Sequence, residues 1–231
     1  MSPLADTARL LADPTRAAFC QALLDGRAWT AGELARHAGV RPSTASEQLS
    51  RLVEGGLLAE ERQGRHRYVR LAGPEAAALI EALAAYAPDR PSPRSLRQSV
   101  RLSAEARART CYDHLAGRLG VALADALIGR NLVADDAGLA VTPEGRAWLT
   151  GTLRYDHPAG SRRPLVRSCL DWTERRPHLA GALGAALCAT ALERSWVRRV
   201  GSGRAVRVTG AGREAFEKLL GVVVDDGDAL T

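Results

Sequence analysis

The sequence predicts a mainly α-helical protein with small β-hairpins: an N-terminal winged helix-turn-helix followed by two degenerate winged-helix-like repeats. Three observations support this fold class. Residues 30–71 contain two capped helices, a tight turn and a basic hairpin; residues 88–102 are rich in proline and arginine; and residues beyond 103 repeat one pattern twice. We therefore expect a DNA-binding domain over 1–87, a linker over 88–102, and a C-terminal domain over 103–231 with repeats at about 103–153 and 165–221.

Two short helices are expected before the helix-turn-helix. Leu4, Ala8 and Leu11 have helical spacing, and Pro14 is suited to the first turn of a second helix. Cys20 lies on the apolar face of that second helix. A free cysteine commonly behaves as a small buried hydrophobe, so we interpret Cys20 as a core residue.

The helix-turn-helix itself is predicted from its caps. Thr30 and Glu33 form a capping-box pattern, Gly39 ends the first helix, and Ser43 can cap the second helix just after Pro42. The inward face of the second helix is apolar, formed by Ala45, Leu49, Leu52 and Val53.

The outward face of this second helix and the hairpin after it carry the predicted DNA contacts. Short hydroxyls, an amide and an arginine suit base edges and phosphates in the major groove. Residues 60–71 alternate about Gln63-Gly64 and predict two strands, whose basic tip suits phosphates or the minor groove. The predicted DNA-binding residues are Ser43, Thr44, Ser46, Glu47, Gln48, Arg51, Arg62, Arg65, His66 and Arg67.

Residues 5–87 resemble the ArsR family of bacterial winged-helix regulators. The motifs that carry the resemblance are Asp13-Pro14-Thr15-Arg16, Glu33-Leu34-Ala35, Gly39-Val40, Ser43-Thr44-Ala45-Ser46, Gly56-Leu57-Leu58, and Gly64-Arg65 with Tyr68. The resemblance implies a homodimeric DNA-binding regulator, usually a repressor. Many relatives sense metals through cysteines in the helix before the recognition helix, or through acidic and histidine ligands in the last helix. This chain departs from both patterns, since residues 31–38 lack cysteine and residues 74–85 offer only Glu75 and Glu81.

Composition sets the cellular context. The four cysteines are widely spaced and no membrane-spanning segment is predicted, so we expect thiols in the reducing cytoplasm and no membrane partner. The net charge of +6 is not concentrated in the DNA-binding domain, because the charges of residues 1–87 cancel. DNA binding must therefore depend on the local placement of arginines.

A further helix can begin at Pro74, with a stripe formed by Ala78, Leu79, Leu83 and Tyr86. A helix of this type often pairs with the partner chain in winged-helix dimers.

The C-terminal half contains an internal repeat. Cys111-Tyr112-Asp113 precedes His114-Leu115-Ala116-Gly117, and Cys169-Leu170-Asp171 precedes, after six extra residues, His178-Leu179-Ala180-Gly181. The agreement continues downstream, where Val141-Thr142 and Gly145 match Val208-Thr209 and Gly212. Each unit is interpreted as a long helix, the first running from Ser103 through Gly129, then a hairpin and a closing helix. Small residues three apart, Gly117 and Gly120 or Gly181 and Gly184, are expected to let helix backbones approach closely.

Cysteine and histidine recur at matching positions of the two repeats. Cys111 and His114 are three residues apart and would share a helical face, and Cys169 and His178 are their counterparts. Two thiolates and two imidazoles fit tetrahedral zinc or another thiophilic metal, so Cys111, His114, Cys169 and His178 are candidates for metal or thiol sensing. The alternative interpretation is that these positions only line the interface between the repeats.

These features predict a sequence-specific DNA-binding transcriptional regulator, a repressor acting as a homodimer on double-stranded DNA. The C-terminal repeats would sense a small-molecule or metal effector, or strengthen assembly. The alternative is a nucleic-acid-associated enzyme using Cys111 or Cys169 as nucleophile and His114 or His178 as base. The sequence lacks a phosphate-binding glycine loop, a Gly-x-Ser-x-Gly elbow and a dense acidic cluster, so we expect a non-enzyme.

Overall fold

The fold is described from a computed structural model that places residues 2–63, 66–86, 95–135, 138–201 and 203–224. The chain divides into two compact units, Met1–Ile80 and Glu81–Thr231, and each is described by itself. Helix α5 (Pro74–Tyr86) contains the point of division. Within the described residues, no helix combines the length and the apolar character needed to cross a membrane.

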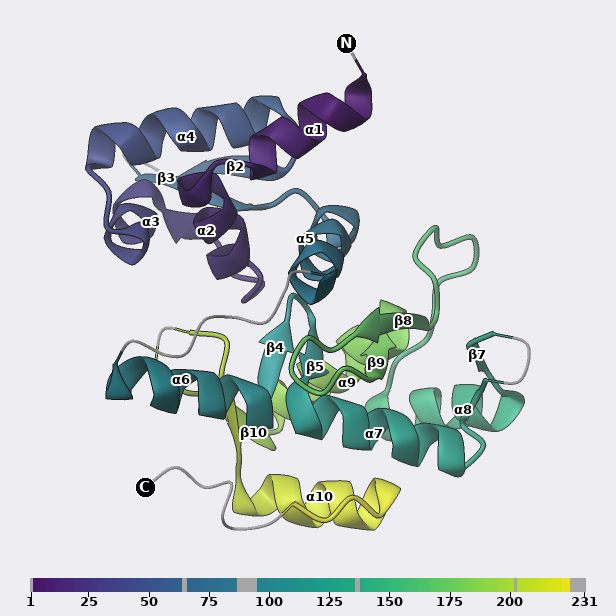
Figure 1. Cartoon of the computed structure of the whole chain (residues 1–231). Coiled ribbons are helices and arrows are strands. Elements are labelled where there is room, and N and C mark those ends of the chain that lie inside the picture. Colours follow the sequence, from purple (N-terminus) through teal and green to yellow (C-terminus); the bar gives the residue numbers. More distant parts are fainter. Residues whose placement is uncertain (1, 64–65, 87–94, 136–137, 202, 225–231) are drawn as a thin grey trace. The chain divides into compact units, whose positions relative to one another are not determined.

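The first unit is a winged helix-turn-helix (Figure 1). Its elements before α5 are α1 (Pro3–Leu11), α2 (Pro14–Leu23), β1 (Trp29–Thr30), α3 (Ala31–Ala38), α4 (Pro42–Glu54), β2 (Leu58–Gln63) and β3 (His66–Leu71). The three strands form an antiparallel sheet in the order β1-β3-β2, in which β2 and β3 are the wing. The predicted winged helix-turn-helix fold is therefore confirmed.

Local sequence accounts for most element boundaries in this unit. Thr30 and Glu33 make both hydrogen bonds of the capping box at the start of α3, and Gly39 ends that helix in the left-handed conformation at φ 68°. The predicted cap of α4 is wrong by two residues: Arg41 is the N-cap, without a side-chain cap, because Pro42 already occupies the first turn. Leu34, Leu49 and the fully buried Cys20 join the core, as the sequence predicts.

The second unit repeats the order hairpin, helix, hairpin, helix. After α6 (Leu96–Arg107), the first repeat contains β4 (Arg109–Cys111), β5 (His114–Ala116), α7 (Gly117–Gly129), β6 (Val133–Ala134), β7 (Ala140–Val141) and α8 (Pro143–Trp148), which continues into a π-helical turn, η1 (Leu149–Leu153). The second contains β8 (Arg167–Leu170), β9 (Pro177–Ala180), α9 (Gly181–Glu193), β10 (Val197–Arg199), β11 (Val206–Val208) and α10 (Gly210–Leu220).

The repeat extends to backbone conformation. Gly117 and Gly181 are the first residues of α7 and α9, with φ of 75° and 85°, and Asn131 and Ser195 after these helices share φ 56°. Thr142 and Thr209 cap α8 and α10 by accepting hydrogen bonds from the backbone N–H groups of Gly145 and Gly212. Matching conformations at matching positions support the predicted duplication.

The predicted helix from Ser103 through Gly129 is wrong. Helix α6 begins at Leu96, within the segment interpreted as linker, and ends at Arg107; the β4–β5 hairpin then intervenes before α7 begins at Gly117. The left-handed backbone at Tyr112 (φ 59°) and Gly117 is incompatible with a helix that continues through this segment. In the second repeat, Pro177 begins strand β9 in the same way.

The predicted role of the glycine pairs also needs correction. A Cβ atom at Gly120 would lie 2.5 Å from the carbonyl oxygen of Leu115, and one at Gly184 would lie 2.3 Å from that of Leu179. At Gly117 the prediction holds, since a Cβ atom there would lie 2.7 Å from the carbonyl oxygen of Ala106 in α6. At Gly120 and Gly184 the close approach is instead between each helix and the strand that precedes it. It lets each hairpin fold tightly against its own helix.

One hydrophobic core unites both repeats. Leu127 and Leu183 are fully buried in it, and the rings of Trp196 and Phe216 meet edge to face with centroids 5.7 Å apart. Contacts cross between the repeats: α7 packs on β9, α9 packs on β5, and β5 packs on β9 (Figure 1). The hairpins β4–β5 and β8–β9 therefore meet at the centre of this unit.

Candidate functional site

The outward face of α4 is polar and accessible, as predicted. Ser43, Ser46, Glu47 and Arg51 are exposed, whereas Thr44 is half-buried. An ion pair of 2.7 Å joins Arg51 Nη2 to Glu47 Oε1, and both side chains are more than half exposed. An exposed i, i+4 pair contributes little to stability, so Arg51 can exchange Glu47 for another partner at small cost.

Gln48 is less exposed than its place on the outward face of the predicted helix suggests. It is half-buried, and its Oε1 accepts a hydrogen bond from Nη1 of Arg16 on α2. The same guanidinium donates to the carbonyl oxygens of Leu10 and Arg9, so it ties α1, α2 and α4 together. Gln48 thus anchors the helix through its oxygen and retains its amide N–H groups for another partner.

The wing carries two arginines around one carboxylate. Glu60 forms ion pairs with Arg62 (3.0 Å) and Arg67 (2.7 Å), and Arg67 also donates to Ser50 of α4 at 3.4 Å. The pKa of the Glu60 carboxyl is lowered, first by its hydrogen bond from Arg62. His66 pairs with Gln63 in the β2–β3 ladder, whereas Arg65 lies outside the described residues.

The second unit brings the predicted Cys and His residues together, but not on helices. Cys111 and His114 are directly opposite each other in the β4–β5 hairpin, and Cys169 and His178 are opposite each other in the β8–β9 hairpin. In the second hairpin the extra residues of the sequence repeat lie between the two strands. The insertion therefore lengthens the turn and preserves the Cys–His register.

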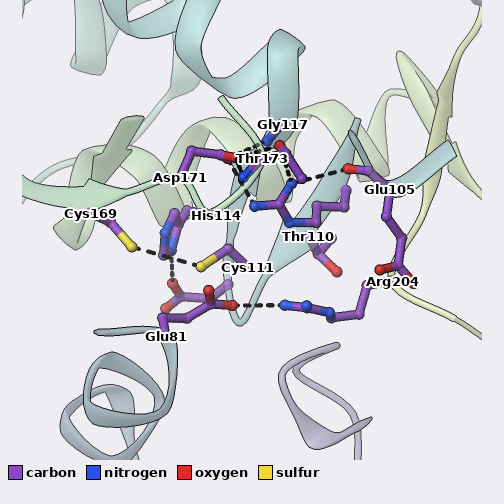
Figure 2. Close-up of polar contacts among 12 residues, drawn as sticks. Glu81, Glu105, Thr110, Cys111, His114, Gly117, Cys169, Asp171, Thr173 and Arg204 are labelled. Atoms are coloured by element: carbon purple, nitrogen blue, oxygen red, sulfur yellow. Dashed lines mark hydrogen bonds and ion pairs between the residues drawn. The ribbon is translucent and has the colours of Figure 1, made fainter. Parts of the chain in front are cut away.

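The four side chains converge on one point, and Figure 2 labels three of them, Cys111, His114 and Cys169. Their ligand atoms all lie within 4.8 Å of one another; Sγ of Cys111 is 3.8 Å from Sγ of Cys169, and Nε2 of His114 is 3.1 Å from Nε2 of His178. Cys111, His114 and His178 are almost fully buried, and Cys169 is partly exposed. Two sulfurs and two imidazole nitrogens in this arrangement can hold a metal ion.

A carboxylate faces the other ring nitrogen of each histidine. Asp113 Oδ1 is 3.2 Å from Nδ1 of His114, and Asp171 Oδ2 is 3.4 Å from Nδ1 of His178. Such carboxylates orient a histidine so that its Nε2 points away from the carboxylate. The Nε2 atoms of His114 and His178 therefore point towards each other.

Each of these carboxylates is paired with an arginine. Arg163 donates to Asp113 at 2.6 Å and to the carbonyl oxygen of Gly181 at 2.8 Å. Arg109 and Asp171 form an ion pair of 2.9 Å, and both side chains are fully buried. The guanidinium of Arg109 also lies 4.7 Å from the ring centroid of Trp172.

The electrostatics of the centre follow from burial and these partners. Burial, with the hydrogen bond to Cys169, raises the pKa of Cys111 well above its ordinary value. The hydrogen bond from Cys111, together with those from His114 and His178, outweighs burial and lowers the pKa of Cys169. Burial alone would lower the pKa of His114, but Asp113 and Cys169 raise it. The two thiols of the centre therefore differ, since the pKa of Cys169 is lowered whereas the pKa of Cys111 is raised.

A second buried ion pair lies beside the centre. Glu81 of α5 accepts a hydrogen bond of 2.7 Å from Arg204, and both side chains are at least nine-tenths buried. The negative charge of Glu81 contributes to the raised pKa of Cys111, and Figure 2 shows the two residues near each other. The carbonyl oxygen of Arg204 accepts from the backbone N–H of Thr110, next to Cys111.

Four further residues belong to this centre and are not predicted from the sequence: Asp113, Asp171, Arg109 and Arg163. A signal existed for the two aspartates, because each follows its cysteine by two residues in both repeats. No comparable signal marks Arg163, which reaches Asp113 from a position 50 residues away in sequence.

The winged fold of the first unit and its exposed recognition helix define the class of helix-turn-helix transcriptional regulators. Residues 11–61 match the family model described as a helix-turn-helix domain. The HTH-type transcriptional regulator YdfF of Bacillus subtilis (strain 168) is 42% identical over 227 residues, which cover 97% of this chain and 100% of YdfF. The chain belongs to this family of transcriptional regulators.

Two further relatives match the first unit. The HTH-type transcriptional regulator CmtR of Mycobacterium tuberculosis is 45% identical over 64 residues, which cover 28% of this chain and 53% of CmtR. The NMR structure of CmtR, titled a cadmium metal-sensor, aligns with 40% of this chain and 96% of that chain at 35% identity and a TM-score of 0.32. The transcriptional repressor BigR of Xylella fastidiosa aligns with 38% of this chain and 88% of that chain at 29% identity and a TM-score of 0.35. CmtR is named a transcriptional regulator and BigR a transcriptional repressor, and each is similar to less than half of this chain.

Proposed function

We propose that the protein is a sequence-specific repressor that reads DNA bases with α4 and holds phosphates with the β2–β3 wing. The observation that carries the proposal is the exposed face of α4, where Arg51 pairs with the exposed Glu47, beside a wing that carries the largely exposed Arg62. Arg51 is the residue best placed to read a base, because it is exposed and its partner among the residues that the structure describes is the exposed Glu47. Ser43, Thr44, Ser46, Glu47 and Gln48 complete the proposed base-reading surface.

The wing has a different role in this proposal. Arg62 is 77% exposed and Arg67 is 23% exposed, so Arg62 can turn from Glu60 towards a phosphate while Arg67 keeps the wing attached to α4. Arg65 and His66 lie between Arg62 and Arg67 in the sequence and belong to the same proposed phosphate-binding set. Phosphate contacts of this kind fix the register of the protein on DNA and add sequence-independent affinity.

We further infer that the regulator acts as a homodimer on chromosomal DNA in the cytoplasm. Leu79, Leu83 and Tyr86 of α5 are 37%, 47% and 91% exposed and lie on one face of the helix. An apolar helix face of this kind favours pairing with the same helix of a second copy.

DNA binding is tested by fluorescence anisotropy with the DNA upstream of the protein's own gene and with a scrambled duplex. Arg51→Ala should weaken specific binding by about 10- to 100-fold and leave scrambled DNA unaffected, since a bidentate base contact contributes about 1–3 kcal/mol of discrimination. Arg62→Ala should weaken binding to both duplexes and reduce the salt slope by about one. Arg70→Ala is the matched control, an exposed arginine at the base of the same wing.

The proposal fails if the wild-type protein does not distinguish the two duplexes at any salt concentration. It also fails if Arg51→Ala and Arg70→Ala bind the upstream duplex equally well.

We also propose that Cys111, His114, Cys169 and His178 bind a thiophilic divalent metal ion, as the effector or as an element of assembly. The convergence of their four ligand atoms within 4.8 Å supports this proposal. The burial of Cys111 and both histidines argues against an enzyme that uses a Cys/His pair, because a substrate has no access to them. Metal analysis and native mass spectrometry of the purified protein, with and without added Zn²⁺, test whether one ion binds per chain.

A further inference from the structure

We propose that the Cys/His centre is a closed, tetrahedral zinc site that clamps the two C-terminal repeats together. This inference rests on the metal binding proposed above and adds the identity, the geometry and the role of the ion. Each repeat contributes one Cys and one His, so neither repeat holds a complete site.

The distances agree with zinc. Tetrahedral bonds of about 2.3 Å to sulfur and about 2.0–2.1 Å to nitrogen place the two sulfurs about 3.8 Å apart and the two nitrogens about 3.3–3.4 Å apart. The structure has 3.8 Å between the sulfurs of Cys111 and Cys169 and 3.1 Å between the Nε2 atoms of His114 and His178. All four ligand atoms lie within 4.8 Å of one another, and the tetrahedral sulfur–nitrogen separation is about 3.6 Å. Metal binding therefore requires only small shifts of these side chains.

The histidine tautomers call for a cation between the rings. Asp113 and Asp171 favour a proton on Nδ1 of His114 and His178, which leaves lone pairs on the two Nε2 atoms. Two lone pairs 3.1 Å apart in a buried site repel unless a proton or a metal ion lies between them. A zinc ion satisfies both nitrogens and both sulfurs at once.

The charges balance when zinc is bound. Zn²⁺ with two thiolates and two neutral imidazoles is neutral, and binding releases the protons that the ligands carried. The flanking carboxylates Asp113 and Asp171 are already neutralised by Arg163 and Arg109. The loaded centre thus leaves no unpaired charge among these buried groups.

The surroundings indicate a structural ion. All four coordination positions are taken by protein atoms, which is typical of structural zinc rather than of a catalytic site with an open position. The ligands join segments 58 and 64 residues apart. Reciprocal packing holds the histidines: a Cβ atom at Gly120 would lie 3.6 Å from Cβ of His178, and one at Gly184 would lie 3.1 Å from Cβ of His114. Each repeat leaves space for the histidine of the other.

The first experiment determines stoichiometry and geometry in the full-length protein. Native mass spectrometry should show one zinc per chain, and replacement by Co²⁺ should give the intense visible absorption of a tetrahedral ion with thiolate charge-transfer bands. Cys111→Ser and Cys169→Ser should lose the ion. Cys188→Ser is the matched control, because Cys188 is buried in the same unit, in α9, but does not belong to the centre.

The second experiment tests the clamp on the wild-type protein, so that misfolded variants cannot obscure the answer. Removing zinc with a chelator should lower the melting temperature of the C-terminal unit by about 10 °C, and adding Zn²⁺ back should restore it. Hydrogen exchange should increase in β5 and β9, where the repeats meet.

The outcomes separate the two proposals. No binding of Zn²⁺ or Co²⁺ by the wild type overturns the proposed metal binding and the clamp together. One bound zinc whose removal changes neither the melting temperature nor the exchange of β5 and β9 overturns the clamp alone. Six-coordinate Co²⁺ spectra would overturn the closed tetrahedral geometry.

Discussion

Replacing Asp171 by Asn should strongly destabilise the C-terminal unit. The carboxylate of Asp171 is fully buried, lies 2.9 Å from the equally buried guanidinium of Arg109, and accepts hydrogen bonds from the backbone N–H groups of Gly117 and Thr173. Asn keeps the shape but removes the negative charge, so the Arg109 charge is left without compensation. Breaking a buried pair in this way costs about 3–5 kcal/mol. In a unit of this size the cost lowers the melting temperature by roughly 6 to 20 °C.

The same pair predicts a pH dependence. Burial tends to raise the pKa of Asp171, but Arg109 and the hydrogen bonds from Thr173 and Gly117 outweigh it, so the pKa is lowered. A carboxyl whose pKa is lower in the folded than in the unfolded state stabilises the fold above the unfolded pKa of about 3.9, and this stability is lost as the pH falls through the folded pKa. Wild-type stability should therefore decline in acid, and Asp171→Asn should remove this part of the decline.

Denaturant and calorimetric unfolding of the zinc-free proteins from pH 2 to pH 7 measures both effects. Asp125→Asn is the matched control, since the Arg176–Asp125 pair has the similar distance of 2.8 Å but side chains that are 58% and 52% exposed. Its loss should cost at most about 1 kcal/mol. If Asp171→Asn also changes the free energy of unfolding by less than about 1 kcal/mol at pH 7, the buried pair is not what stabilises this region.

Further predictions concern the repeated backbone features. Gly117→Ala should destabilise the protein by about 1–3 kcal/mol in thermal unfolding, because the residue has φ 75° and its new Cβ would lie 2.7 Å from the carbonyl oxygen of Ala106. The control is Gly129→Ala, in open space at the end of α7, which should be neutral or stabilising. Equal effects of the two substitutions would contradict this reasoning. Thr142→Ala and Thr209→Ala should each lower the free energy of unfolding by about 0.5–2 kcal/mol in denaturant unfolding, since each removes one N-cap. A large loss at only one position would show that the two caps are not equivalent.

Most of the first unit could be predicted because its boundaries are set by neighbouring residues. The capping box of Thr30 and Glu33 needs only a spacing of three, and Gly39 ends α3 through its own backbone conformation. The turn after α3 follows from Pro42, even though the cap was assigned to the wrong residue. Local rules of this kind act within a few residues and can be recognised in a single sequence.

The structure of the second unit is harder to predict from the sequence, because its residue spacing and its turn conformations favour different structures. Leu115, Leu119 and Leu123 are four residues apart and favour a continuous helix, whereas the β4–β5 hairpin depends on left-handed conformations at Tyr112 and Gly117. The repeat correctly aligned the four metal-ligand candidates but could not show how they meet. Their convergence depends on tertiary packing between residues about 60 positions apart, and local periodicity carries no information about such packing.

The two hairpins explain why a duplication is needed to make this centre. One hairpin presents a single opposed Cys–His pair, which is half of a tetrahedral ligand set. A second copy related by pseudo-symmetry supplies the other half, provided that its register is unchanged. The β8–β9 hairpin meets this condition, because its insertion lies in the turn and Cys169 remains opposite His178. The extra residues of the second repeat therefore lie in a turn, where they do not change the geometry of the centre.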